Sequence, residues 1–229
     1  MSINIKISLI FLILLTHNVI YSDCILYSIY NLNEKHWEDT IDCSEEILNK
    51  KYSAGSLFKI FIVSSGFYFN ILKKKDIKEV QYFMRKSDND YFLKLLNKIN
   101  KNNFISFMNN NMKQYIKLNL NSNVFSDDFS YLYGGKLKFY PEEILNWFKL
   151  LAIDNSFYMK QTLKTMRIKY KDKTYYGKSG TWGGSAWYCG IIPEKNTKVL
   201  CVLNIYKIPY WKKAKQESFL TFIQILIGK

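Results

Sequence analysis

Strand-like alternation of apolar and polar residues occurs at both ends of the chain, whereas the middle repeats apolar residues at helical spacing. Two alternating segments, at about 24–31 and 36–42, predict a β-hairpin, and three more strands are predicted from Lys173 onward. The stretch 73–169 predicts mainly helices, and a closing amphipathic helix is expected over 210–227. These patterns favour an α+β fold, in which both chain ends build one antiparallel sheet with the helical middle on one side.

The first 22 residues read as a secretory signal. Lys6 precedes an apolar run from Ile7 to Leu15, and the small residue Ser22 closes the segment. The run is too short to span a bilayer as a stable helix, although an uncleaved anchor is the alternative interpretation. We expect a signal peptide over 1–22 and one domain over 23–229, secreted or periplasmic, with no stable membrane span after cleavage.

The formal net charge of +14 raises the question of an anionic partner. The lysines are scattered, with a single run of three at 73–75, so nucleic-acid binding is not expected. The excess charge instead favours anionic substrates or an anionic envelope surface. Only His17 and His36 are histidines, and no Cys/His cluster has ligand spacing, so we expect no metal site.

The four cysteines gain interest from the predicted export, because disulfides persist in oxidising compartments. A turn centred between residues 31 and 36 would place Cys24 opposite Cys43. The turn signal PEKN would likewise place Cys189 nearly opposite Cys201. Both pairs are disulfide candidates, and both could also stay reduced, because disulfide geometry in regular ladders is demanding.

The first chemical motif is Ser56-Leu57-Phe58-Lys59, at the start of a predicted buried helix. Residues at i and i+3 share a helix face, so the Ser56 hydroxyl and the Lys59 amine would meet. A helix N-terminus stabilises an anion, which suits an oxyanion hole partly formed by the Ser56 amide. A lysine buried among apolar neighbours loses preference for its charged form and suits the role of base. Alone, the motif is weak, because chance matches are common and a serine N-cap with a solvent-reaching lysine explains it better.

Two further motifs follow in the chain. Ser87-Asp88-Asn89 would be an ordinary helix N-cap in isolation, and Lys178-Ser179-Gly180-Thr181 would be a turn or strand end. On a strand, alternation points Lys178 and Gly180 to one face, and the bare Gly180 would let a substrate backbone lie alongside. Taken together and in this order, S-x-x-K, S-D-N and K-[ST]-G are the signature of penicillin-binding proteins and serine β-lactamases.

Within that superfamily the chain resembles class D β-lactamases most. The resemblance rests on KYSAGSLFKIFIVSSGFYFNIL, on YGGKLKFYPEEILNWFKLLA, and on QTLKTMRIKYKDKTYYGKSGTW followed by AWYCGII. It implies hydrolysis of β-lactam antibiotics through an acyl-enzyme on Ser56. It also implies that carbon dioxide carbamylates Lys59, giving an N6-carboxylysine that acts as general base for acylation and deacylation, with no other cofactor.

The resemblance also assigns roles to the remaining motif residues. Ser87 would relay protons to the leaving nitrogen, Lys178 would orient the substrate carboxylate, and Thr181 would donate the second oxyanion N–H. Lys212 stands about where the family carries a carboxylate-binding arginine and lacks that group's bidentate fork. The substrate-binding residues implied are therefore Asn89, Lys178, Ser179, Gly180, Thr181 and Lys212.

Some residues depart from the class D pattern and keep alternatives open. Asn89 replaces the valine of the family's Ser-x-Val, and Leu132 stands near the position of the tryptophan that holds the carbamate. Glu142 begins E-x-x-L-N, the pattern of the class A deacylating loop, in a stretch that otherwise reads as a plain helix. The alternative functions are a small DD-peptidase or transpeptidase acting on peptidoglycan stem peptides, and a penicillin sensor that is acylated without efficient turnover.

Overall fold

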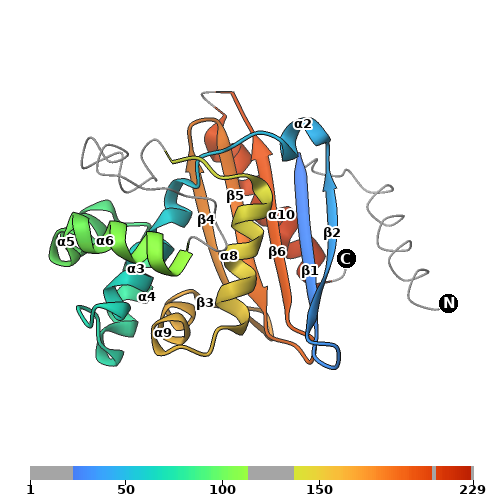
Figure 1. The fold of residues 1–229 in the computed structure, drawn as a ribbon. Coiled ribbons are helices and arrows are strands. Elements are labelled where there is room, and N and C mark those ends of the chain that lie inside the picture. The colour runs from blue at the N-terminus through green and yellow to red at the C-terminus, as the bar shows by residue number, and fades with distance from the viewer. Residues whose placement is uncertain (1–22, 113–136, 208–209, 228–229) are drawn as a thin grey trace.

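The computed structural model describes residues 23–112, 137–207 and 210–227. Its centre is a six-stranded antiparallel sheet with the strand order β2-β1-β6-β5-β4-β3 (Figure 1). The strands are β1 (Cys24–Asn31), β2 (His36–Cys43), β3 (Arg167–Tyr170), β4 (Lys173–Trp182), β5 (Ser185–Ile192) and β6 (Lys198–Ile205). Because β6 pairs with β1, both ends of the chain contribute to one sheet, as predicted.

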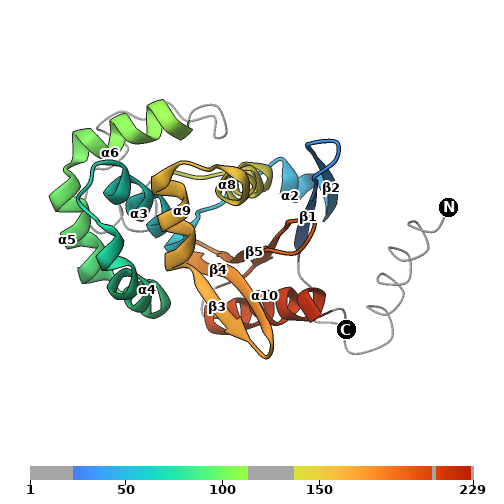
Figure 2. The ribbon, with the colours of Figure 1, turned by 90° about the horizontal axis from the view of Figure 1, so that it is seen from below.

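The helices lie on both faces of this sheet. They are α2 (Glu45–Leu48), the 3₁₀ helices η1 (Gly55–Phe58) and η2 (Lys74–Asp76), α3 (Lys59–Tyr68), α4 (Ile77–Lys86), α5 (Asn89–Ile99), α6 (Lys101–Phe107), the π-helical turn η3 (Met108–Met112), α8 (Pro141–Ile153), α9 (Phe157–Thr165) and α10 (Trp211–Ile227). Seen from below, α10 covers one face of the sheet, and the helical middle of the chain covers the other (Figure 2). None of the described helices combines the length and the apolar character that a membrane crossing requires.

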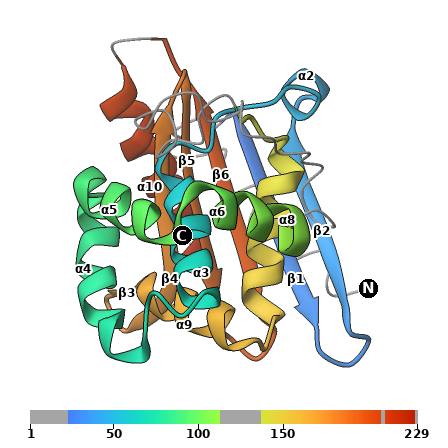
Figure 3. The same ribbon diagram turned by 60° about the vertical axis from the view of Figure 1, so that its left-hand side comes forward.

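Helix α3 lies in the interior of the helical layer, between the sheet and helices α5 and α6 (Figure 3). Every residue from Lys59 to Phe67 is buried, so the apolar positions do not form a single stripe. Aromatic rings fill the space around the helix, and Phe61 stacks on Trp147 of α8 with ring centroids 4.5 Å apart. The first turn of α3 is therefore held in a fixed place by tight packing.

The predicted hairpin has the expected register. Cys24 faces Cys43 and forms a disulfide with it, across a Cα–Cα distance of 4.4 Å. Cys189 also faces Cys201, but both are buried free thiols. Of the two candidate pairs, the structure has one disulfide and one pair of thiols.

Two details differ from the sequence expectation. Strand β3 lies in the stretch that was assigned to helices, because the four residues RIKY are too few to reveal an alternation. The predicted helix beginning at Ser56 starts instead as η1, continues as α3, and ends at Tyr68. Asn70 then has a φ of 57°, a left-handed conformation that ends the helix.

Candidate active site

Ser56 lies in η1, and Lys59 is the first residue of α3. Residues at i and i+3 eclipse each other in a 3₁₀ helix, so the two side chains project from the same side of the chain. Ser56 is partly exposed, whereas Lys59 is fully buried. The segment thus presents a reachable hydroxyl beside an amine that is shielded from water.

The chain before Ser56 is fixed to the sheet by hydrogen bonds to one carbonyl group. The main-chain oxygen of Ser53 accepts from Oγ of Ser185 at 2.8 Å and from Nε1 of Trp187 at 2.9 Å. Both donors alternate onto the same face of β5. The position of the serine therefore depends on the central strands as much as on α3.

Glycines allow η1 and β4 to touch. A Cβ atom at Gly180 would lie 2.8 Å from the amide nitrogen of Leu57 and closer still to the main-chain oxygen of Ala54. Gly55 has a φ of 52°, and a Cβ there would lie 2.8 Å from the carbonyl carbon of Thr181. The space that the missing side chain of Gly180 leaves is occupied by η1, and the expectation that a substrate backbone lies along the strand at Gly180 stays a prediction.

The edge of β4 beside η1 is open. Strand β3 pairs only with Lys173–Tyr176, and the amide of Gly177 then donates to Met166 at 3.0 Å. Amide directions alternate along a strand, so the N–H of Thr181 points to the same open side as that of Gly177. The Thr181 main chain therefore lies beside Gly55, next to Ser56, with its amide facing away from β5.

Lys59 makes two short hydrogen bonds to the turn between α4 and α5. Its Nζ donates to the main-chain oxygen of Ser87 at 2.5 Å and to Oδ1 of Asn89 at 2.6 Å. Burial lowers the pKa of Lys59 to about 8; the Asp88 carboxylate opposes this shift, and the positive charge of Lys215 adds to it. About a tenth of the side chain is therefore free amine at pH 7, far more than for an unperturbed lysine.

Lys178 reaches the same turn from the sheet. Its Nζ donates to Oγ of Ser87 at 2.9 Å and to the main-chain oxygen of Ser179 at 2.8 Å. Burial lowers the pKa of Lys178 well below its usual range, and the positive charges of Lys59 and Lys215 lower it further. Lys59 from the helical layer and Lys178 from the sheet thus both contact Ser87. The lowered pKa of each lysine favours its neutral amine form.

The conformation of the turn explains how Ser87 contacts both lysines. Ser87 follows α4 with a φ of 56°, a left-handed conformation, and Asp88 caps α5 by accepting from the amide of Tyr91 at 2.9 Å. This tight reversal directs the carbonyl group of Ser87 to Lys59 and its hydroxyl group to Lys178. The N-cap interpretation of the motif is thus correct for Asp88, and it coexists with the contacts of Ser87 and Asn89.

The structure brings Ser56, Lys59, Ser87, Asn89, Lys178, Ser179, Gly180 and Thr181 to one region. Lys212 is different. Its side chain is exposed, and its Nζ lies 5.5 Å from the ring centroid of Trp211.

Lys215 was missed by the sequence reasoning. Its positive charge lowers the pKa of both Lys59 and Lys178. The neighbouring residue Ala214 is tied to the sheet, because its main-chain oxygen accepts from Nδ2 of Asn204 at 3.2 Å. In the structure Lys215 is half-buried beside buried Ala214, whereas Lys212 and Lys213 are exposed, and the sequence KKAK gave no signal of this difference.

Other predicted features lie elsewhere. Glu142 is exposed in the first turn of α8, while Glu143 accepts from the amide of Tyr140 at 2.8 Å and so caps the helix. The E-x-x-L-N pattern therefore forms an ordinary capped helix, and Glu142 has no contact with Ser56 or Lys59 within the described part of the chain. Leu132, like the signal peptide expected over 1–22, lies outside the described residues.

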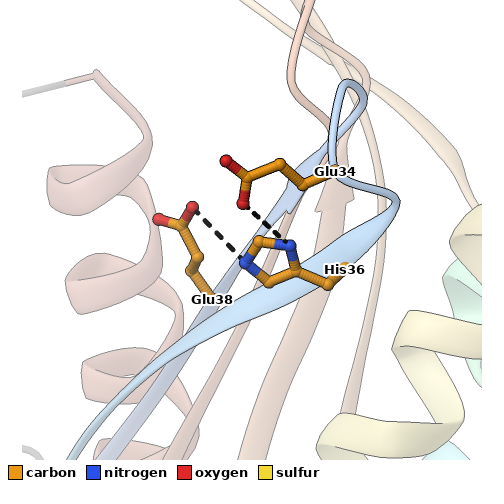
Figure 4. A group of neighbouring side chains, drawn as sticks. All are labelled: Glu34, His36 and Glu38. Carbon is orange, nitrogen blue, oxygen red and sulfur yellow. Dashed lines mark ion pairs between the residues drawn. The ribbon is translucent and has the colours of Figure 1, made fainter.

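In the described ranges, Glu34, His36 and Glu38 are the one group of three side chains close enough together for metal binding. Figure 4 shows them on the exposed β1–β2 hairpin. Nδ1 of His36 lies 3.2 Å from Glu34, and Nε2 lies 3.8 Å from Glu38. The carboxylates face different nitrogens of one ring, so the three side chains as placed do not converge on a single ion.

Comparison with known proteins gives a likeness of structure rather than of sequence. No protein-family model and no curated protein matches the chain. A class D β-lactamase from Fusobacterium nucleatum subsp. polymorphum superposes with a TM-score of 0.68 at 17% identity, over 97% of this chain and 99% of that one. The chain has the β-lactamase/transpeptidase fold.

Two further solved structures show the same likeness. The C-terminal domain of the Bacillus licheniformis BlaR penicillin-receptor gives a TM-score of 0.67 at 19% identity, over 89% of this chain and 90% of that one. A class D β-lactamase from Nostoc gives 0.66 at 13% identity, over 88% and 92%. Both a receptor domain and hydrolases therefore share this architecture.

Proposed function

We propose that the protein is a serine β-lactamase that β-lactams acylate at Ser56. One observation carries the proposal: a buried lysine with a lowered pKa stands one 3₁₀ turn after a partly exposed serine, beside a second such lysine joined to Ser87. The structural neighbours, which include class D β-lactamases and a penicillin-receptor domain, support the substrate class. The Cys24–Cys43 disulfide supports a place outside the cytoplasm.

The chemistry of acylation follows from these positions. The neutral amine of Lys59 takes the proton of Ser56 as Oγ attacks the lactam carbonyl carbon. The amides of Ser56 and Thr181 would stabilise the negative oxygen that forms. The carbon–nitrogen bond then breaks, and the nitrogen takes a proton from the Ser87 hydroxyl. The ammonium form of Lys178 gives Ser87 a proton through their 2.9 Å hydrogen bond and ends as the neutral amine.

The substrate carboxylate would lie near positive charge at the open end of β4. Lys215 is better placed for this role than Lys212, because its charge acts on both site lysines. Ser179 and Gly180 would line the bound substrate on the strand, and Asn89 would bind it from the helical side. Lysine offers a compact charge and not the bidentate fork of arginine.

A carbamate on Lys59 stays a prediction, and the contacts of the amine favour the unmodified side chain. Nζ donates to two carbonyl oxygens, at 2.5 and 2.6 Å, whereas a carbamate nitrogen keeps a single hydrogen and adds a negative group. The residues present therefore fit an amine better than a carbamate. Turnover should accordingly be the same with and without added bicarbonate.

The same contacts favour a second candidate function, a receptor that stays acylated. Once Lys59 has taken the serine proton, Ser87 and Asn89 stabilise the resulting ammonium group. A lysine that holds its proton in this way is a poor base for the water that must release the acyl group. Fast acylation with slow deacylation is the behaviour expected of such a receptor.

Labelling with a fluorescent penicillin tests these functions. Wild type should be labelled, Ser56→Ala should not, and Ser64→Ala should be labelled as the control, because Ser64 is a buried serine of α3 that bonds Ile60. Loss of label within minutes indicates hydrolysis, and persistent label indicates the receptor function. Equal labelling of Ser56→Ala and wild type would overturn both.

A further inference from the structure

An open, solvent-exposed pocket of about 640 Å³, called the cavity below, lies between α4 and β3 near the candidate active site. It is lined by Gln81, Arg85, Arg167, Ile168 and Lys169. In Figures 2 and 3, α4 and β3 approach each other at the edge of the sheet where β3 is the last strand. Nothing in the proposed acylation chemistry uses these residues.

The composition of the lining is unusual for this chain. Arg85 and Arg167 are the only arginines among its 33 lysines and arginines, and both line this one cavity. Lys169 adds a third positive charge. Arginine differs from lysine in presenting a planar fork of donors that matches a carboxylate or a phosphate. The placement therefore indicates an anion-binding subsite.

The two walls of the cavity are held together by one carbonyl group. The main-chain oxygen of Arg167 accepts from Nε2 of Gln81 at 2.8 Å and from Nη2 of Arg85 at 3.1 Å. The guanidinium of Arg85 is thus oriented by a single bond, which leaves most of its five donors for a ligand. Neither arginine forms an ion pair with an acidic side chain in the described ranges.

Both walls continue into the candidate active site. Arg85 is two residues before Ser87 on the helical side. On the sheet side, Arg167 pairs with Tyr176, two residues before Lys178 on β4. Two residues of a strand span about 7 Å, so the cavity begins about 7 Å from Lys178 along β4.

The direction along β4 fixes which part of a substrate would reach the cavity. With its carbonyl oxygen at the amides of Ser56 and Thr181 and its carboxylate near the charges of Lys178 and Lys215, a bound β-lactam would point its leaving side toward Arg167. We propose that the cavity of Arg85, Arg167 and Lys169 binds a carboxylate or phosphate group on the leaving side of the substrate. The orientation of the substrate in this inference rests on the proposed function. The existence of an anion site at this cavity does not depend on that function.

A matched pair of cephalosporins tests the inference. The two differ only in the ring substituent on the leaving side, which ends in a carboxylate in one and in a primary amide in the other. The mass of the acylated protein over time gives the acylation rate. Wild type should prefer the carboxylate about tenfold, the effect of one well-formed charge-assisted contact. Arg85→Gln/Arg167→Gln should lose this preference and keep its rate with the amide compound.

Two control variants distinguish the effect of the planar donor geometry of arginine from the effect of its positive charge. Arg85→Lys/Arg167→Lys keeps both charges and should retain only part of the preference. Lys195→Gln removes one exposed charge from the β5–β6 turn and should retain all of it. A preference that is equal in wild type and in the double glutamine variant would overturn the inference.

The outcomes distinguish this inference from the proposed function. If neither cephalosporin acylates wild type, the proposed function fails. The anion site is then judged by the melting temperature in citrate against sodium chloride of the same ionic strength. Citrate should stabilise wild type more than Arg85→Gln/Arg167→Gln. Normal acylation with equal rates for the two cephalosporins would reject the subsite alone.

Discussion

The Nζ atom of Lys59 lies 2.6 Å from the amide oxygen of Asn89, the first residue of α5. This oxygen stabilises the ammonium form, so Asn89→Leu should lower the pKa of Lys59 below about 8. Because acylation needs the free amine, the midpoint of its pH profile should move to lower pH. The measurement is the second-order rate constant of penicillin acylation at a series of pH values.

The control for this experiment is Asn97→Leu, an exposed position on the same helix. It should leave the midpoint unchanged. The midpoint is the relevant quantity, since the plateau rate also reflects any contact of Asn89 with substrate. A midpoint that rises in Asn89→Leu would contradict the role given to this hydrogen bond.

Lys215 should influence the site lysines, and Lys212 should not. The positive charge of Lys215 lowers the pKa of Lys59, so Lys215→Gln should raise that pKa and move the acylation midpoint to higher pH. Below the midpoint, the rate falls about tenfold per pH unit, because the free-amine fraction does so. Lys212→Gln, one helical turn away, should leave the midpoint in place. A shift caused by Lys212→Gln alone would reverse the assignment.

Gly180→Ala should disrupt the close packing of η1 against β4. The added Cβ would meet the amide nitrogen of Leu57 at 2.8 Å and would crowd the main-chain oxygen of Ala54. Backbone atoms cannot rotate away, so we expect a loss of about 2 kcal/mol in the free energy of unfolding and acylation slowed at least tenfold. Urea titration and penicillin labelling measure the two effects.

Gly183→Asn is the matched control for that substitution. Gly183 has a φ of 58°, which asparagine tolerates, and its added Cβ would lie 3.7 Å from Cβ of Ser53, an ordinary contact. Acylation by this variant should stay near the wild-type rate. Should Gly180→Ala label as fast as Gly183→Asn, the close contact between η1 and β4 would be unimportant for function.

The disulfide should contribute to stability, whereas the buried thiol pair should not react in the folded protein. Cys24→Ser/Cys43→Ser should lose about 3 kcal/mol of unfolding free energy, the usual effect of a loop of this length. Alkylation of denatured, unreduced protein should modify Cys189 and Cys201 only. Modification of four cysteines, or of none, would contradict this pairing.

The sequence predicted the fold well where a pattern repeats over many residues. The hairpin register that pairs Cys24 with Cys43 followed from a turn placed midway between two strands. Strand β3 was missed, because its four residues, alternately exposed and half-buried, are too few to outweigh the helical pattern of their neighbours. The 3₁₀ start of the helix at Ser56 depends on the contact with β4, which local sequence does not encode.

The candidate site was predictable to the extent that its motifs lie on regular elements. The motif spacing placed Ser56 and Lys59 one helical turn apart at the start of a buried helix, as the structure has them. Lys178 lies on the predicted strand β4, and its Nζ contacts Ser87. The contacts of Asn89 and the influence of Lys215 depend on how helices pack on the sheet. A run such as KKAK gives no sign of which lysine faces inward until the packing of α10 is known.

The central claim is that β-lactams acylate Ser56. The most direct measurement is the intact mass of the protein followed over time after mixing with a penicillin, with the modified residue located by peptide mapping. We predict that the mass rises by one penicillin, that the adduct lies on Ser56, and that Ser56→Ala shows no increase. An unchanged mass in wild type, or an adduct of equal yield in Ser56→Ala, would contradict the account.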